Sequence, residues 1–191
     1  IKNTMTAETA LHAVPAAANV DALRDLLPEF AKDIRLNLSS VLKEDPNAGL
    51  KLNQVLGIAL AAAYATRNHA VIHALEGESK EVLGAEEVNA AKAAATIMAM
   101  NNIYYRSLYM TEDAELGKMP AGLRMNVIGN PGIDKITFEL YALAVSAVNG
   151  CSACVKSHAA KVQQEGLSRG AVQQTFKIAS VLFAAAQALS V

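Results

Sequence analysis

Alanine accounts for 37 of the 191 residues of this chain, against 11 glycines and 5 prolines. Alanine is the best helix former, and its small side chain lets neighbouring helices approach one another closely. Few segments show the alternation of apolar and polar residues, enriched in β-branched and aromatic types, that is typical of strands. The sequence therefore predicts an all-α protein.

Apolar spacing, capping residues and helix breakers divide the chain into segments. Asp21 is expected to cap the first helix, and Pro28 to stand where a second helix begins. Longer helices are predicted over residues 50–66, 68–78, 85–109, 134–149 and 151–164. Ser168 is expected to cap a last helix that ends near Leu189, and residues 111–132, with their prolines and glycines, are expected to be the main irregular connection.

These helices are expected to form one domain over residues 21–191, preceded by a poorly ordered leader at residues 1–20. At an offset of 84 residues the layout of residues 50–104 matches that of residues 134–188, with Leu83 in register with Leu167. At this offset Arg67 is the counterpart of Cys151. The match raises the hypothesis of an internal two-fold repeat, and the alternative is that alanine-rich helices resemble one another without a duplication.

Charge and hydropathy argue against two classes of partner. The formal net charge of −1 offers no long-range attraction for nucleic acid or for an anionic membrane. No apolar run reaches the roughly 18 residues that a membrane span needs, and residues 1–20 lack the pattern of a secretory signal. A cytoplasmic protein with neither nucleic-acid nor membrane partner is expected.

The only two cysteines, Cys151 and Cys154, are spaced C-x-x-C, and His158 follows the second by four residues. If the stretch is helical, the three side chains share one stripe. Gly150 breaks the preceding helix, so both sulfurs are expected in the first turn of a new one. Unpaired backbone N–H groups and the helix dipole stabilise a thiolate there. In a reducing cytoplasm such a pair favours redox or metal chemistry over a permanent disulfide.

Zinc binding is the main competing interpretation of this motif. Cys151, Cys154 and His158 would supply three ligands of the types that zinc prefers. The fourth ligand would have to come from elsewhere, and no second C-x-x-C supports the site. A c-type haem would need a histidine directly after the second cysteine, where Val155 stands, and inert core cysteines are a further interpretation.

Glu139 lies on the preceding predicted helix, eleven residues before Gly150, or roughly 16 Å back along that helix at 1.5 Å per residue. If the two helices pack antiparallel, its carboxylate reaches the level of His158. A carboxylate beside an imidazole orients the ring and raises its basicity. Its apolar neighbours Phe138 and Leu140 argue against a solvent-exposed position of Glu139 on the protein surface.

Together, Glu139, Cys151, Cys154 and His158 match the E-x11-C-x-x-C-x-x-x-H signature of the alkylhydroperoxidase AhpD family, which this chain resembles. Further segments look like the same family, at residues 26–40, 65–68, 98–106, 122–126, 130–133 and 138–151. The resemblance covers about residues 21–189. Related carboxymuconolactone decarboxylases share the helical fold but not the cysteine motif.

The resemblance implies an AhpD-like helical bundle that assembles as a homotrimer and acts as a thiol-dependent peroxidase on organic hydroperoxides. It implies that Cys154 reacts with the peroxide, that Cys151 closes the disulfide, and that Glu139 and His158 form the proton relay. No bound cofactor or metal is expected, and dihydrolipoamide is the expected external reductant. The expected partners are a peroxiredoxin of the AhpC type and a lipoyl-bearing acyltransferase with dihydrolipoamide dehydrogenase.

One departure from the family concerns Ala153, because some members carry a second histidine at that position. The proton relay would then depend on His158 alone. Two alternative functions follow: a disulfide-relay adaptor with little direct peroxidase activity, and a zinc-binding helical module. Four polar residues are expected to hold the irregular segment or to face a neighbouring subunit, and they are Asn101, Asn102, Arg106 and Arg124.

Overall fold

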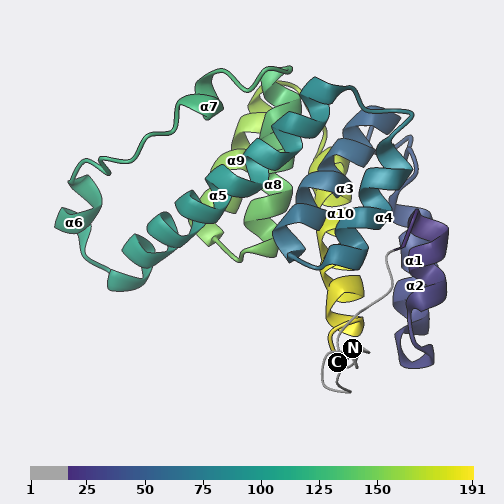
Figure 1. The fold of residues 1–191 in the computed structure, drawn as a ribbon. Coiled ribbons are helices and arrows are strands. Elements are labelled where there is room, and N and C mark those ends of the chain that lie inside the picture. The colour runs from purple at the N-terminus through teal and green to yellow at the C-terminus, as the bar shows by residue number, and fades with distance from the viewer. Residues whose placement is uncertain (1–16) are drawn as a thin grey trace, which may run out of the picture.

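The computed structural model describes residues 17–191, and this part of the chain contains helices and no strand, which confirms the all-α prediction. The helices, shown in Figure 1, are α1 (Val20–Leu26), η2 (Glu29–Ala31), α2 (Lys32–Val41), α3 (Leu52–Thr66), α4 (His69–Ser79), α5 (Ala85–Thr111), α6 (Ala114–Lys118), α7 (Asn126–Gly129), α8 (Lys135–Val148), α9 (Ser152–Gln164) and α10 (Arg169–Ala188).

The beginning of the fold differs from the prediction. Residues 1–16 of the predicted leader lie outside the described residues, but Ala17 and Val20 are buried, so the packed part of the chain begins before Asp21. The prediction that Asp21 caps the first helix is wrong. Asn19 adopts the extended backbone of an N-cap and accepts the N–H of Ala22 at 2.9 Å, two residues earlier than expected.

Helices α3 and α8 form the centre of the core. Residues 55–63 of α3 are all buried, and Glu139 is the single residue between positions 137 and 146 of α8 that is not. The two helices approach closely at Gly57, where an added Cβ would lie 1.9 Å from the hydroxyl oxygen of Tyr141. Burial is the main cause that raises the pKa of Tyr141 well above its ordinary value.

The helices are arranged as two similar units, α3–α4–α5 and α8–α9–α10. Helix α3 of the first unit packs against α10 of the second, and in the same way α8 of the second unit packs against α5 of the first. Helices α3 and α8 also pack against each other and so join the two units. The N-caps Gly84 and Ser168 lie 84 residues apart, whereas the N-caps Asn68 and Cys151 lie 83 apart. The counterpart of Cys151 is therefore Asn68 and not Arg67, because the stretch from the N-cap of α9 to the N-cap of α10 is one residue longer than the stretch from the N-cap of α4 to the N-cap of α5.

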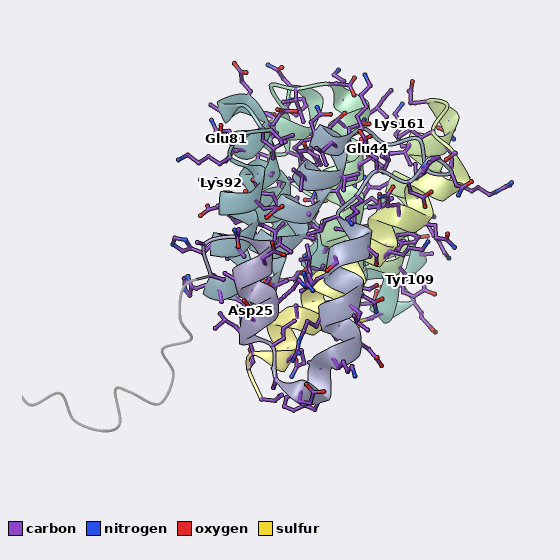
Figure 2. All side chains as sticks on the ribbon, turned by 90° about the vertical axis from the view of Figure 1, so that its right-hand side faces the viewer. Asp25, Glu44, Glu81, Lys92, Tyr109 and Lys161 are labelled. Carbon is purple, nitrogen blue, oxygen red and sulfur yellow. A yellow bond between two sulfur atoms is a disulfide. The ribbon has the colours of Figure 1, made fainter. Side chains whose placement is uncertain are left out.

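The connection between the two units extends away from the helical body. The C-terminal part of α5 projects beyond the body, and the short helices α6 and α7 lie along the stretch that returns to α8 (Figure 1). The C-terminal part of α5 and this stretch together form the projecting segment. The returning stretch agrees with the irregular connection predicted at residues 111–132. Side chains such as those of Glu81 and Lys161 lie at the periphery of the molecule (Figure 2). Within residues 17–191, no helix combines the length and the apolar character needed to cross a membrane.

Candidate redox site

The turn between α8 and α9 fixes the position of Cys151. Gly150 adopts a left-handed backbone with φ +69°, a conformation that glycine accepts without steric cost. Its N–H donates to the carbonyl of Ala147 at 3.2 Å, and the N–H of Cys151 donates to the carbonyl of Ser146 at 3.1 Å. This pair of bonds is the Schellman motif, which ends α8. Cys151 is thereby placed as the N-cap of α9.

Cys151 and Cys154 are joined in a disulfide. The Sγ of Cys151 accepts the backbone N–H of Cys154 at 3.3 Å, so the sulfur takes the place of the oxygen that usually caps a helix. The sulfur of Cys151 thus lies at the first turn of α9, as expected, but the residue itself precedes the helix, with an extended backbone of φ −91° and ψ 97°, whereas the predicted helix began at Cys151. Cys154 and His158 remain one helical turn apart on the same face of α9.

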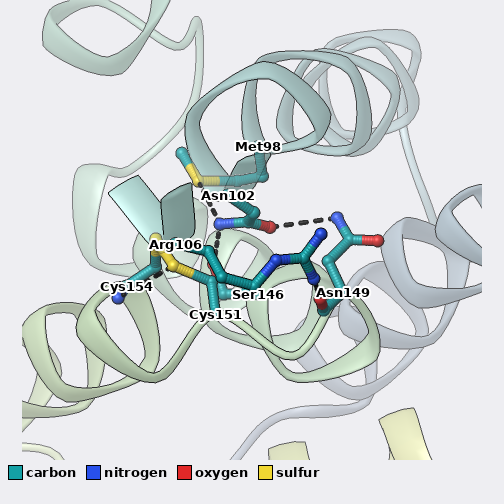
Figure 3. Close-up of a disulfide and its surroundings, with 7 residues drawn as sticks. All are labelled: Met98, Asn102, Arg106, Ser146, Asn149, Cys151 and Cys154. Carbon is teal, nitrogen blue, oxygen red and sulfur yellow. Dashed lines mark hydrogen bonds between the residues drawn. A yellow bond between two sulfur atoms is a disulfide. The ribbon is translucent and has the colours of Figure 1, made fainter. Parts of the chain in front are cut away.

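A hydrogen-bonded network from α5 lies beside the disulfide (Figure 3). The Asn102 side-chain amide donates to the Ser146 hydroxyl at 2.9 Å and accepts from the Asn149 side chain at 3.0 Å. Arg106 donates to the backbone carbonyl of Asn149. Asn102 and Ser146 are buried, and buried polar groups that are fully paired hold their surroundings in one arrangement. The network ties α5 to the turn that carries Cys151.

Of the two expectations for Asn102 and Arg106, the one that they hold the irregular segment is not met, because their partners belong to α8 and to the α8–α9 turn. Sequence reasoning missed Ser146 and Asn149 altogether. The partners lie 43 to 47 residues apart along the chain, and no local pattern connects them. The only available signal is the spacing of Met98, Asn102 and Arg106, which places the three on one face of α5.

Glu139 and His158 meet between α8 and α9. The Nδ1 atom of His158 lies 2.6 Å from Oε2 of Glu139, and the side chains are 13% and 18% exposed. The carboxylate therefore holds the proton on Nδ1, which leaves Nε2 free to accept one. The expected proximity of Glu139 to His158 is present. Lys161, at the same level, instead pairs with Glu165 at 2.6 Å, and this hydrogen bond raises the pKa of Lys161.

A cavity of about 260 Å³ opens beside the disulfide. Cys154 lines it and is 6% exposed, whereas Cys151 is 0% exposed and lies behind it. Polar groups from α5 and α9 form part of the wall, and apolar side chains from α5 and the α7 region form the rest. The lining residues are Met98, Asn101, Tyr105, Met125, Ile128, Ala153, Cys154, Ser157 and His158.

The arrangement suits thiol chemistry in a shielded space. One sulfur meets the cavity, an oriented imidazole stands beside it, and the second sulfur is already bonded to the first. Within residues 17–191, no three histidine, cysteine, aspartate or glutamate side chains are grouped so as to hold a metal ion. The geometry gives the zinc interpretation no support.

Comparison with known proteins points to one family. Residues 114–191 match the carboxymuconolactone decarboxylase family. The chain is 49% identical over 164 residues to "Alkyl hydroperoxide reductase AhpD" of Coxiella burnetii (strain RSA 493 / Nine Mile phase I), covering 86% of this chain and 93% of that protein. It is 48% identical over 171 residues to the protein of the same name from Rhodospirillum centenum, covering 90% of each. A third, from Streptomyces griseus, is 48% identical over 163 residues, covering 85% of this chain and 90% of that protein.

Proposed function

This chain belongs to the alkyl hydroperoxide reductase AhpD family, and on that premise we propose that it reduces organic hydroperoxides through a disulfide cycle of Cys151 and Cys154. One observation supports the proposal most directly. Cys154 is the sulfur that meets the cavity, and His158, held by Glu139, lines the same cavity. The apolar part of the wall, with Met98, Met125 and Ile128, suits the alkyl group of such a substrate.

The reaction begins with the reduced protein. His158 takes the proton of the Cys154 thiol on Nε2, and Glu139 stabilises the resulting imidazolium. The thiolate attacks the terminal oxygen of the hydroperoxide, and the O–O bond breaks. The alkoxide that leaves takes the proton back from His158 and departs as an alcohol, and Cys154 becomes a sulfenic acid.

The second half of the cycle closes the disulfide. The sulfur of Cys151 attacks the sulfur of the sulfenic acid, and hydroxide leaves and combines with the proton of the Cys151 thiol as water. The product is the Cys151–Cys154 disulfide, the form that the structure contains. Two electrons have passed from the two thiols to the peroxide bond.

A dithiol must then return the protein to its reduced form. We propose a dihydrolipoyl group, carried by an acyltransferase and regenerated by dihydrolipoamide dehydrogenase, with a peroxiredoxin of the AhpC type as an acceptor of electrons. A slender alkyl dithiol suits a cavity of about 260 Å³ in whose wall Cys154 is the only cysteine. A homotrimer is proposed as the working assembly, and the exposed apolar side chains of the projecting segment support a subunit interface there.

Titration of free thiols with and without hydroperoxide tests the proposed function. One equivalent of cumene hydroperoxide is expected to consume both thiols of the reduced protein. Cys154→Ser should leave its one remaining thiol intact, whereas Cys151→Ser, the matched control, should still form a sulfenic acid on Cys154 that dimedone traps. Both thiols surviving in the wild type, with oxidation only by an oxidised peroxiredoxin, would favour the disulfide-relay adaptor instead.

A further inference from the structure

One buried side chain of α5 holds the turn that carries Cys151 at two points (Figure 3). Asn102 is 1% exposed, and its amide donates to the hydroxyl of Ser146 at 2.9 Å and accepts from the side chain of Asn149 at 3.0 Å. The backbone carbonyl of Ser146 accepts the N–H of Cys151 at 3.1 Å, and Asn149 is the C-cap of α8. Asn102 therefore bridges the two residues between which the chain turns toward Cys151.

Arg106 holds the same turn through its main chain. It lies one helical turn after Asn102 on α5 and donates to the backbone carbonyl of Asn149, one of the carbonyls that the end of a helix leaves without a partner. None of these hydrogen bonds involves Cys154, whose backbone N–H donates to the sulfur of Cys151. Of the two cysteines, the network therefore acts on Cys151.

This restraint has its greatest effect when the disulfide is open. In the oxidised protein the bond between the sulfurs fixes Cys151 by itself. After reduction the position of Cys151 depends on the turn, and the turn contains Gly150, the residue type with the largest backbone freedom. Hydrogen bonds that are buried away from water resist such a rearrangement. Two thiols that are already held in position lose less entropy when they join, so their disulfide is more stable.

We propose that Asn102 is a positioning residue that keeps Cys151 beside Cys154 in the reduced protein and thereby stabilises the disulfide relative to the two thiols. The inference goes beyond the proposed function, because it holds for any oxidant that closes the disulfide. In exchange with a small dithiol, one reagent thiolate attacks the disulfide and the second reagent thiol releases the protein. Two electrons and two protons pass to the protein, the reagent becomes a disulfide, and Asn102 transfers no proton.

Asn102→Leu tests the inference, because leucine has a similar size and makes neither hydrogen bond. In the variant the oxidised protein must keep the turn without these bonds, whereas the reduced protein can relax. The equilibrium constant for disulfide formation, measured in buffers of reduced and oxidised dithiothreitol, is expected to fall about 10-fold, which is about 30 mV. Maleimide labelling and mass spectrometry give the oxidised fraction. A loss of stability that both forms share cancels in this equilibrium, so a purely structural role would not change it.

Ser146→Ala is a second test, because it removes one of the two bonds and leaves Asn102 in place. It should lower the same constant by about 3-fold. Asn89→Leu is the matched control, since Asn89 is an exposed residue of α5 that lies 13 residues, or roughly 20 Å, before Asn102. Alkylation of reduced Cys154 by iodoacetamide should stay within about 2-fold in all three variants.

A wild-type equilibrium constant in both Asn102→Leu and Ser146→Ala would overturn the inference. An equal shift in Asn89→Leu would overturn it as well, because the change would then not depend on the turn. The measurement uses no peroxide, so its result is independent of whether the protein reduces cumene hydroperoxide.

Discussion

Cys151 and Cys154 carry the same functional group three residues apart, yet their surroundings favour different tasks. The sulfur of Cys151 caps α9 and accepts a backbone N–H, an environment that stabilises a thiolate. Access favours the other cysteine, because only Cys154 lines the cavity beside His158. Since a peroxide must reach the sulfur before electrostatics can matter, we propose Cys154 as the attacking residue and Cys151 as the residue that resolves the sulfenic acid.

At this scale, Glu139→Gln tests the proton relay. The glutamine oxygen still accepts a hydrogen bond from Nδ1 of His158, but the charge that stabilises the imidazolium is gone. Oxidation of Cys154 by hydroperoxide is expected to slow about 100-fold, the lower end of what general acid–base catalysis contributes. Stopped-flow measurement of sulfenic acid formation checks this. Glu165→Gln, which removes the ion pair with Lys161, is the control and should be neutral. An undiminished rate in Glu139→Gln would exclude the relay.

At the scale of helices, α3 and α8 approach each other closely at Gly57. The Tyr141 ring occupies the space that a Cβ would need, with its hydroxyl oxygen at 1.9 Å and ring carbons at 2.3 and 2.6 Å from that position. Tyr141 is 0% exposed and cannot move toward solvent. Because α8 also carries Glu139, the spacing of these two helices sets where the relay stands relative to α9.

Gly57→Ala is therefore expected to destabilise the protein by about 1–3 kcal/mol, the usual cost of overpacking a core. Urea denaturation followed by circular dichroism measures the change in the free energy of unfolding. Gly117→Ala in α6 is the matched control, because nothing lies within 4 Å of the added Cβ there. That variant should be neutral or slightly stabilising. Equal stability of Gly57→Ala and the wild type would mean that α3 and α8 are not packed this closely.

At the scale of the whole molecule, the projecting segment is distinguished by its position away from the helical body (Figure 1). Large apolar side chains are exposed along it, and they are Ile103, Tyr105, Tyr109, Met110, Met119 and Leu123. Water-exposed apolar side chains grouped in this way mark an interaction surface. This distribution supports the proposed homotrimer, and Tyr105 also lines the cavity, so a neighbouring subunit would lie close to the redox site.

Met110→Glu tests the assembly, because Met110 is 73% exposed on this segment. Sedimentation velocity is expected to give the wild type a mass about three times the 20.1 kDa of one chain, and the variant a lower mass. A charge buried at an interface without a partner is unfavourable. Phe30→Glu is the control, since Phe30 is also 73% exposed but lies in η2, outside this segment. A monomeric wild type, or an unaltered trimer in Met110→Glu, would contradict the proposed interface.

By itself, the sequence determined the helices and the chemistry of the motif, because both depend on residues close together in the chain. Alanine content, apolar spacing, the Ser168 cap and the break at Gly150 act over one or two helical turns. The C-x-x-C spacing and the resemblance carried by Glu139 and His158 identified the candidate site. The N-cap at Asn19 escaped prediction, because Asn19 and Asp21 are both good capping residues and only the backbone distinguishes them.

Only the tertiary structure decided which side chains meet. The bonds of Asn102 with Ser146 and Asn149 span 44 and 47 residues, and the position of Asn101 in the cavity wall depends on how α5 packs against α9. The two asparagines are adjacent and chemically identical, so sequence cannot separate their roles. Packing separates them, because a rotation of about 100° along the helix turns one toward Ser146 and Asn149 and places the other in the wall of the cavity.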